Sequence, residues 1–190
     1  YNAFLIVDEA HATGVMGAQG RGLSGGADGA DLIIGTFGKA FGSFGAYVAC
    51  TAIVKDYLVN KCAGLIYATG LPPYVLGCID AALDMVPDMD DERAHLHNMA
   101  QHLRGKLAEW GYDTGPSASQ IIPVILGDAD RTMQFSESLR QRGIYLTAIR
   151  PPTVPEGTAR LRIALSVAHR HDDIEILLEG LKALASQKAA

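Results

Sequence analysis

The sequence lacks the features that mark several special classes of protein. Basic residues are not in excess, since 16 Lys and Arg stand against 21 Asp and Glu. They are also scattered along the chain, so nothing favours a nucleic-acid or anionic-membrane surface. No apolar run approaches the roughly 18 residues that span a bilayer, and no basic-headed apolar segment opens the chain as a signal peptide would. The expectation is a cytosolic protein.

Cysteine is scarce as well. The three cysteines, Cys50, Cys62 and Cys78, are odd in number, and none belongs to the C-x-x-C pair that zinc and redox sites use. We interpret them as small buried apolar residues. An initiator methionine is also missing, because the chain opens on Tyr1 and leads at once into the apolar run of residues 3–7. This start predicts that a preceding part of the protein is absent.

What the sequence does contain is enough apolar material for one or two folded domains. Apolar residues make up 48% of the 190 positions and charged residues 19%, which argues against disorder. Short apolar runs bounded by Gly or Asp occupy residues 4–7, 32–35 and 46–50. Such runs are typical of strands buried on both faces of a mainly parallel sheet. Polar groups at the strand ends would then gather along one edge.

The spacing of apolar residues predicts the remaining elements. We expect helices over residues 51–60, 73–86, 96–110, 131–142 and 174–184, and strands over residues 65–67, 121–126, 144–149 and 161–165. Asp172 and Asp173 are placed to cap the last helix and to oppose its dipole. The pattern changes after Asp88, which predicts two domains over residues 1–87 and 88–190, the second an α+β layer.

Two motifs, an acidic one and a glycine-rich one, have to be considered as possible signs of nucleotide binding. Residues 8–11 spell the D-E-A-H motif of a helicase-type ATPase, but the required G-x-x-x-x-G-K-[ST] loop is absent, because Ile33 precedes Gly38-Lys39 at the position of its first glycine. An ATP-dependent motor fragment stays a distant alternative. Residues 20–25 match G-x-G-x-x-G without the preceding strand and following helix, so we interpret them as a surface turn.

Histidine offers no metal site. His95, His97 and His102 share one predicted helix, yet no two of them have the i, i+4 spacing that directs two imidazoles to one ion. We expect these side chains to face solvent, and no metal is predicted.

Lys39 and Asp8 point to a different chemistry. Lys39 stands in a glycine-rich segment just after a predicted buried strand, and Asp8 ends another such strand. In parallel order both would face one cavity at the same edge of the sheet. A carboxylate against a pyridine nitrogen keeps pyridoxal phosphate protonated, while a lysine amine binds that cofactor as an imine and moves protons at the substrate Cα.

Other polar residues could complete such a site. Thr36, which we place one helical turn before Lys39, can donate its hydroxyl to the cofactor phosphate. His11 can reach the ring oxygen or a substrate carbonyl, although a histidine that only holds a loop is a serious alternative. Arg150 and Arg162 are candidates for binding a carboxylate through two parallel hydrogen bonds. Arg160 lies two positions before Arg162 and would share its face of a strand, so spacing does not choose between them.

Long blocks of sequence then resemble one family, the α-oxoamine synthases, which are pyridoxal-phosphate enzymes. The resemblance covers nearly the whole chain, in matching order. The blocks are Asp8-Glu9-Ala10-His11-Ala12-Thr13-Gly14, Gly35-Thr36-Phe37-Gly38-Lys39-Ala40-Phe41-Gly42, Leu71-Pro72-Pro73, and residues 150–163 from Arg150-Pro151-Pro152-Thr153 to Arg162-Ile163. The runs after Lys39 and around Pro151 are most similar to members that condense L-alanine with a pimeloyl thioester, with loss of CO2, in biotin biosynthesis.

The resemblance implies an α/β fold of type I for pyridoxal-phosphate transferases: part of the mainly parallel sheet of the large domain in residues 1–87, and a C-terminal α+β small domain in residues 88–190. It implies an acyltransferase that works as a homodimer with shared active sites. Its substrates would be a small amino acid and an acyl thioester of coenzyme A or of acyl carrier protein. Relatives that use glycine or serine with other acyl groups share the catalytic residues, so they remain an alternative.

The family's site residues carry over position by position. Lys39 matches the imine lysine, Asp8 the partner of the pyridinium, His11 the partner of the ring oxygen, and Thr36 a phosphate ligand. Thr69 matches a residue that reaches the phosphate of the neighbouring subunit, although Ala68 replaces a hydroxyl residue often found beside it.

The resemblance also places the substrate. Arg162 matches the arginine that binds the amino-acid carboxylate, Thr153 matches a substrate-contacting position, and Arg150 is a weaker candidate for the same pocket. Because the family's N-terminal half also contributes to the site, we expect this chain alone to bind the cofactor poorly and to turn over little.

Overall fold

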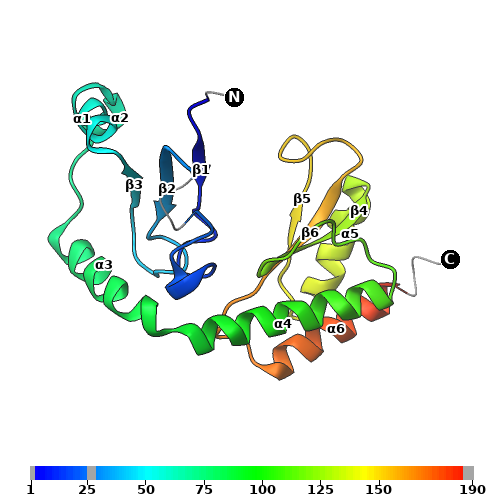
Figure 1. The fold of residues 1–190 in the computed structure, drawn as a ribbon. Helices are drawn as coiled ribbons and strands as arrows, with labels where there is room; N and C mark the ends of the chain where they lie inside the picture. Colours follow the sequence, from blue (N-terminus) through cyan, green and yellow to red (C-terminus); the bar gives the residue numbers. More distant parts are fainter. Residues whose placement is uncertain (1–2, 25–28, 186–190) are drawn as a thin grey trace. The chain divides into compact units, whose positions relative to one another are not determined.

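The computed structural model describes residues 3–24 and 29–185 and divides into two compact units (Figure 1). Unit 1 is Tyr1–Arg93 and unit 2 is Ala94–Ala190. Gly25, the last glycine of the G-x-G-x-x-G match, lies outside the described residues. No helix within the described ranges is long and apolar enough to cross a membrane.

Unit 1 contains a three-stranded mixed sheet in the order β1-β2-β3. The strands are β1 (Ile6–Asp8), β2 (Leu32–Thr36) and β3 (Ala46–Cys50), close to the three predicted runs. β1 and β2 are parallel, with Asp8 opposite Ile34, whereas β3 returns antiparallel to β2. The tight connection between β2 and β3 explains the antiparallel pairing, because a parallel crossover needs a dozen or more residues.

The strands of unit 1 are not buried on both faces, contrary to the prediction. Leu32 is 8% exposed, but Ile6 is 56% and Val48 47% exposed. A strand is buried on both faces only when a layer packs on each of them, and part of this sheet has no such cover among the described residues.

Helices follow the sheet of unit 1. They are α1 (Ala52–Lys61), the short α2 (Ala63–Ile66), and α3 (Pro73–Met85), which continues into the 3-10 turn η2 (Val86–Asp88). A second 3-10 turn, η1 (Ala18–Gly20), precedes β2. The predicted helices 51–60 and 73–86 are confirmed: Thr51 caps α1 by accepting the N–H of Val54, and Pro73 occupies the first turn of α3.

Two predictions for this region are wrong. Residues 65–67 were expected to form a strand, but Leu65 belongs to α2, since an apolar run of three residues is too short for its period to separate strand from helix. The cysteines were expected to be buried, but Cys50 and Cys62 are only half-buried and Cys78 is exposed on α3. All three are free thiols.

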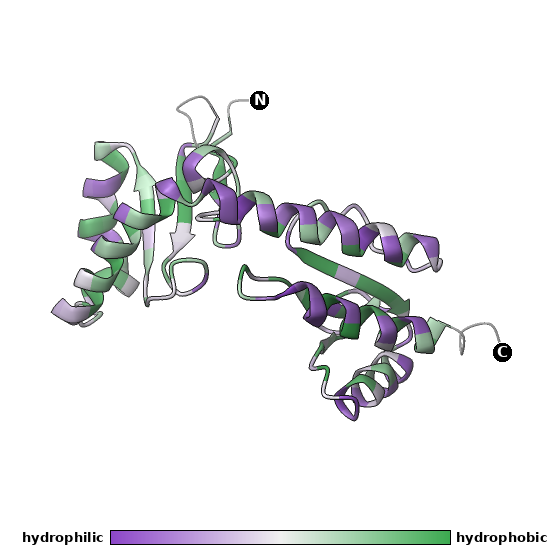
Figure 2. Cartoon of the chain, turned by 90° about the horizontal axis from the view of Figure 1, so that it is seen from below, coloured by the Kyte–Doolittle hydropathy of each residue, from purple (hydrophilic) through white to green (hydrophobic). Residues whose placement is uncertain are grey.

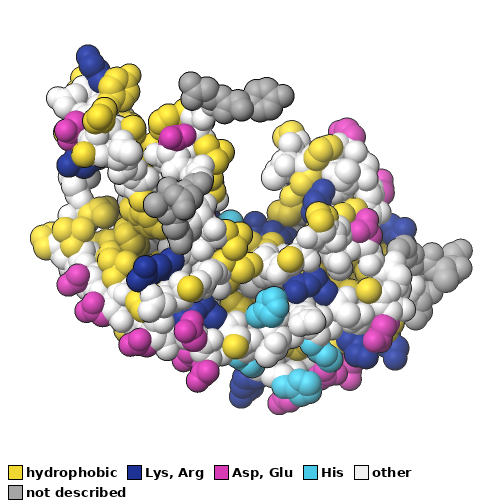
Figure 3. Space-filling view, viewed as in Figure 1, with side chains coloured by type: hydrophobic (Ala, Val, Ile, Leu, Met, Phe, Trp, Pro, Cys, Tyr) yellow, Lys and Arg dark blue, Asp and Glu magenta, His cyan; other side chains and the backbone are white. Residues whose placement is uncertain are grey.

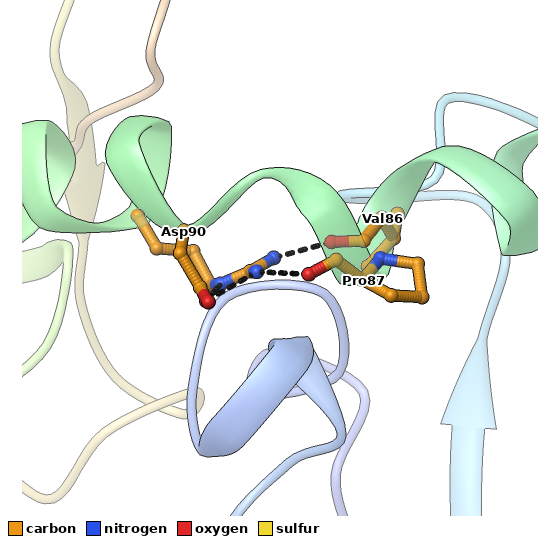
Figure 4. Close-up of polar contacts among 4 residues, drawn as sticks. Val86, Pro87 and Asp90 are labelled. Carbon is orange, nitrogen blue, oxygen red and sulfur yellow. Dashed lines mark hydrogen bonds and ion pairs between the residues drawn. The ribbon is translucent and has the colours of Figure 1, made fainter.

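Arg93 holds the end of α3 and η2 against the start of α4 (Asp90–Glu109), as Figure 4 shows. Its guanidinium donates to the carbonyl oxygens of Val86 at 2.6 Å and Pro87 at 3.0 Å. It also bonds the Asp90 carboxylate from Nε at 3.1 Å and Nη2 at 2.6 Å. Carbonyl groups at a helix end have no partner within the helix, and Arg93 supplies one.

Unit 2 is an antiparallel sheet with helices. The sheet order is β4-β6-β5, formed by β4 (Ile121–Gly127), β6 (Ala159–Ala164) and β5 (Thr147–Ile149). α4, α5 (Ala129–Arg140) and α6 (His171–Ala185) are amphipathic, whereas the strands are mainly apolar (Figure 2). The fully buried side chains of its core include Leu103, Leu107, Ile122, Val124, Leu139, Leu161 and Leu181.

Glycine at a helix end explains why β5 is shorter than the predicted strand 144–149. After α5, Gly143 adopts φ +80°, its N–H bonds the carbonyl of Arg140, and the N–H of Ile144 bonds the carbonyl of Leu139. This pair of bonds is a Schellman cap, which uses Ile144 to end the helix. The other predicted helices and strands of this unit are confirmed, although α4 begins at Asp90, six residues before its predicted start at residue 96.

Candidate functional site

The carboxyl ends of β1 and β2 meet at one edge of the sheet in unit 1. Asp8 is the last residue of β1 and Thr36 the last of β2, and these two strands are parallel neighbours. Lys39 follows three residues after Thr36. The pairing therefore brings the segments that carry Asp8 and Lys39 to the same edge, which is where open α/β sheets bind ligands.

Asp8 has one carboxylate oxygen fixed and one open. Its Oδ1 accepts the N–H of Ala10 at 2.8 Å. The N–H of Glu9, directly after β1, bonds the carbonyl of Ile34 on β2 at 2.7 Å and so extends the pairing of the two strands. Oδ2 of Asp8 has no hydrogen bond from the described residues, and the side chain is exposed. A carboxylate held on one oxygen keeps its direction and offers the other to a ligand.

His11 lies in the turn that follows β1. The N–H groups of Ala12 and Thr13 both bond the carbonyl of Glu9 at 2.9 Å, and the Thr13 hydroxyl bonds the same oxygen at 3.0 Å. This turn returns the chain beside Asp8 and leaves the His11 side chain exposed.

The segment that carries Lys39 is the closed loop between β2 and β3. The N–H of Phe37 bonds the carbonyl of Gly45 at 2.9 Å, and the Thr36 hydroxyl donates to the same oxygen at 2.9 Å while accepting the N–H of Gly38 at 3.2 Å. Lys39 is exposed, and its amine has no partner among the described residues.

The expectation for Thr36 needs correction. Thr36 is not one helical turn before Lys39, because it ends β2 and the residues after it form bends. Its single hydroxyl proton goes to Gly45. A donated bond from Thr36 to a phosphate would require that proton to be released from the loop.

Aromatic rings support this edge of the sheet. Tyr47 lies over Gly35, where a Cβ would overlap its ring. The Phe37 ring is 5.2 Å from the Tyr47 ring and 5.5 Å from the Phe41 ring, centre to centre. The Tyr47 hydroxyl is 3.0 Å from the Thr13 hydroxyl, so β3 is linked directly to the turn that carries His11.

Sequence reasoning missed three residues of this region. Tyr47 and Thr13 form the link just described, and Glu9 is 3% exposed with its carboxylate bonded to the backbone of Leu23 and Ser24. Only Tyr47 had a usable signal, since a large ring opposite glycine on a neighbouring strand often fills the space of the missing side chain.

Thr69 lies in the segment between α2 and α3. It is exposed and makes no hydrogen bond with any described residue. No hydrogen bond among the described residues of unit 1 therefore joins Thr69 to Asp8, His11 or Lys39.

The predicted substrate residues belong to unit 2, whereas the cofactor candidates belong to unit 1. Arg162 is exposed on β6 opposite Thr147 of β5, and it lines a cavity of about 490 Å³. Its guanidinium has no partner among the described residues. Arg160 shares its face, as predicted, but donates from Nε to Thr158 at 2.9 Å, which leaves Arg162 the freer cation of the two.

Arg150 and Thr153 share a turn after β5. The N–H of Thr153 bonds the carbonyl of Arg150 at 3.1 Å, and both side chains are exposed. The turn holds the two residues close in space, as a shared substrate pocket would require.

Comparison with known proteins identifies the family. The model of the aminotransferase class I and II family matches residues 1–181, and the chain belongs to this family. The curated 8-amino-7-oxononanoate synthase of Gluconacetobacter diazotrophicus is 56% identical over 187 residues, which cover 98% of this chain and 47% of that protein. The chain spans about half the length of the curated relatives it matches.

Solved structures agree with this assignment. Serine palmitoyltransferase from Sphingomonas wittichii has a TM-score of 0.88 at 30% identity and covers 98% of this chain, which covers 48% of it. 8-amino-7-oxononanoate synthase from Francisella tularensis has a TM-score of 0.86 at 28% identity. The match covers 98% of this chain and 56% of that one. The fold is that of part of a type I pyridoxal-phosphate transferase, as predicted, and the ATP-dependent motor gains no support.

Proposed function

We propose that this chain is part of an 8-amino-7-oxononanoate synthase, which condenses L-alanine with a pimeloyl thioester and releases CO2 and the free thiol carrier in biotin biosynthesis. The identity of about half the positions to curated proteins of that name supports the proposal. The observation that carries it is the parallel pairing of β1 and β2, which puts Asp8 and the Lys39 loop at one sheet edge.

The residues at this edge fit pyridoxal phosphate. When bound, that cofactor withdraws electrons from the substrate Cα and so allows the carboxyl group to leave. Asp8 would offer its open oxygen to a protonated pyridine nitrogen, and the Lys39 amine, which has no partner among the described residues, would bind the cofactor aldehyde. His11 would bond the ring oxygen, and Lys39 would move the proton at the substrate Cα. Thr36 is the phosphate ligand of this proposal once its bond to Gly45 is exchanged.

The substrate carboxylate belongs, in this proposal, to Arg162. A guanidinium that no described residue engages can form two parallel bonds to a carboxylate, and Arg162 lines a cavity large enough for a small amino acid. Arg150 and Thr153 are the further contacts, with the acyl thioester of coenzyme A or of acyl carrier protein as second substrate.

A homodimer with shared active sites completes the proposal, with Thr69 reaching the phosphate of the neighbouring subunit. Figure 3 shows hydrophobic side chains on the surface of unit 1. Among the described residues of unit 1, the exposed hydrophobic side chains include Ile53, Tyr57, Tyr67, Tyr74 and Met85, each more than 60% exposed. Apolar area of this extent favours cover by further polypeptide. The proposed domains are residues 1–87 for the large domain and 88–190 for the small one.

Serine is the competing amino-acid substrate, since serine palmitoyltransferase is a close structural neighbour. Glycine-using synthases are a further alternative. The test adds alanine, glycine and serine in turn to a protein of the relatives' full length that carries this chain, and follows the visible absorbance of the bound cofactor. A change with alanine alone supports the proposal, and a change with serine or glycine alone replaces alanine as the substrate.

Lys39→Ala tests the cofactor assignment. We expect the visible band of the wild-type protein to disappear, because this variant lacks the amine that the proposal bonds to the cofactor aldehyde. Lys55→Ala, which removes an exposed lysine of α1, is the control and leaves the band in place. A band that survives Lys39→Ala contradicts the assignment. The 190-residue chain by itself is expected to give a weak band and little turnover.

A further inference from the structure

Glu9 is the one buried carboxylate among the described residues, and the proposed chemistry does not use it. It is 3% exposed and stands between Asp8, which ends β1, and the turn with His11. A charged group is removed from water only where other groups replace its hydration. The surroundings of Glu9 therefore reveal what it does.

The loop of residues 20–24 supplies that replacement. The backbone N–H of Leu23 bonds Oε2 of Glu9 at 3.0 Å, and the N–H of Ser24 bonds Oε1. Gly22, at φ +89°, comes so near that a Cβ there would lie 2.7 Å from Oε2. Only glycine allows this approach, so the loop closely surrounds the carboxylate.

The ionised form of Glu9 is favoured in this setting. Burial acts to raise the pKa of Glu9, but hydrogen bonds from the Ser24 hydroxyl and from the backbone N–H groups of Leu23 and Ser24 outweigh it, and the pKa is lowered. With both oxygens bonded inside the protein, Glu9 is unsuited to exchange protons with a substrate.

The backbone of Glu9 joins the same structure to the site. Its N–H bonds β2 at Ile34, and its carbonyl accepts bonds from Ala12 and Thr13. Farther along the turn, the N–H of Gly14 bonds the carbonyl of Gly20 at 2.7 Å. The N–H of Gly22 also bonds the carbonyl of Met16 at 2.9 Å, so two backbone bonds and the Glu9 side chain together hold the turn to the loop.

We propose that Glu9 is a positioning residue, whose carboxylate fixes the 20–24 loop against the turn and so holds Asp8 and His11 in place for the cofactor. The inference rests on the proposed function for the identity of that cofactor. The connection between turn and loop itself is independent of it.

Amide hydrogen exchange without cofactor tests the connection, in a protein of the relatives' full length that carries this chain. In the wild type, Leu23 and Ser24 should be protected although they lie in a loop. In Glu9→Gln, exchange at these amides should be faster by roughly tenfold or more, as expected for lost bonds to a charged acceptor. Ala12 and Thr13 should also exchange faster. Glu92→Gln, the same change at an exposed position of unit 1, is the control and should alter none of them.

Cofactor titration of the same variants tests the positioning role. We expect Glu9→Gln to weaken pyridoxal-phosphate binding several-fold at temperatures where the protein remains folded, whereas Glu92→Gln binds like the wild type. Unchanged binding together with lower thermal stability overturns the positioning role. Fast exchange at Leu23 and Ser24 in the wild type also overturns it, even where Glu9→Gln does not fold. A wild type without a cofactor band refutes the proposed function and leaves the exchange result standing.

Discussion

Single residues decide how closely the elements of this site can approach. Gly35 on β2 has no side chain, and the Tyr47 ring of β3 occupies the space that one would fill. The same ring brings its hydroxyl within 3.0 Å of Thr13 in the turn after β1. One absent Cβ therefore allows a contact between the third strand and the turn that carries His11.

Gly35→Ala is expected to destabilise unit 1 by roughly 1–3 kcal/mol, because the added methyl group overlaps the Tyr47 ring and the strands have to move apart. Chemical denaturation followed by circular dichroism measures the change. Gly77→Ala in α3 is the control: its Cβ would meet no atom, and alanine stabilises a helix by roughly 0.5–1 kcal/mol relative to glycine. Equal effects of the two substitutions would rule out the overlap.

Whole elements are joined by a small number of polar side chains, and Arg93 is the clearest example. Its side chain is 10% exposed, and it bonds two carbonyl groups at the end of α3 and η2 as well as the Asp90 carboxylate. Gly20 also lies against it, since a Cβ there would come within 3.0 Å of Nη1. Arg93 therefore connects η1, η2 and the first turn of α4.

Arg93→Met is expected to cost about 1–3 kcal/mol, because the carbonyls of Val86 and Pro87 lose a charged donor. Arg140→Met provides the comparison, since Arg140 forms an exposed i, i+3 pair with Glu137, a type of contact that adds little stability. Thermal unfolding of both variants measures the difference. If Arg140→Met lowers the melting temperature as much as Arg93→Met does, the joining role of Arg93 is refuted.

At the scale of whole units, the stability of unit 2 is expected to depend on pH in the alkaline range. Burial raises the pKa of Tyr112 to about 12, although the positive charge of Arg131 acts in the opposite direction. A raised pKa means that the folded state favours the protonated phenol, whose hydroxyl donates to Leu181 at 2.7 Å. The stability from this preference is complete below pH 10 and is lost as the pH rises to about 12.

Trp110 is the single tryptophan of the chain and lies in unit 2, so its fluorescence follows the unfolding of that unit. Denaturant midpoints measured from pH 9 to pH 12 should fall for the wild type. Tyr112→Phe should start lower and lose less over the same range, because it has no phenol to ionise. Parallel curves for the two proteins would show that Tyr112 does not cause the loss.

The sequence predicted those parts of the structure that depend on periodic patterns and strand ends. Helical spacing located α3, α4 and α6, and the polar ends of two apolar runs placed Asp8 and the Lys39 segment at one sheet edge. The strand expected at 144–149 began late, because Gly143 draws Ile144 into a helix cap.

The parts that failed depend on contacts between distant residues. In the sequence, Glu9 is not distinguished from the other residues of the D-E-A-H motif. Only its bonds to Leu23 and Ser24 show that its carboxylate is buried and holds the 20–24 loop. The Thr36 hydroxyl donates its proton to the carbonyl of Gly45, and no local sequence pattern predicts that bond. The burial of β1 and β3 was overestimated. An apolar run shows that a segment favours a strand, whereas its burial depends on which other elements pack against the sheet.

The closed loop between β2 and β3 limits how the amine of Lys39 can move. Phe37 and Thr36 fasten the loop to Gly45, so the backbone beneath Lys39 has little slack. Under the proposed function, movement of the Lys39 amine between cofactor and substrate must then come from rotation about the bonds of its own side chain. Lengthening the loop by one residue would shift the backbone of Lys39 and misdirect its amine, while both strands stay intact.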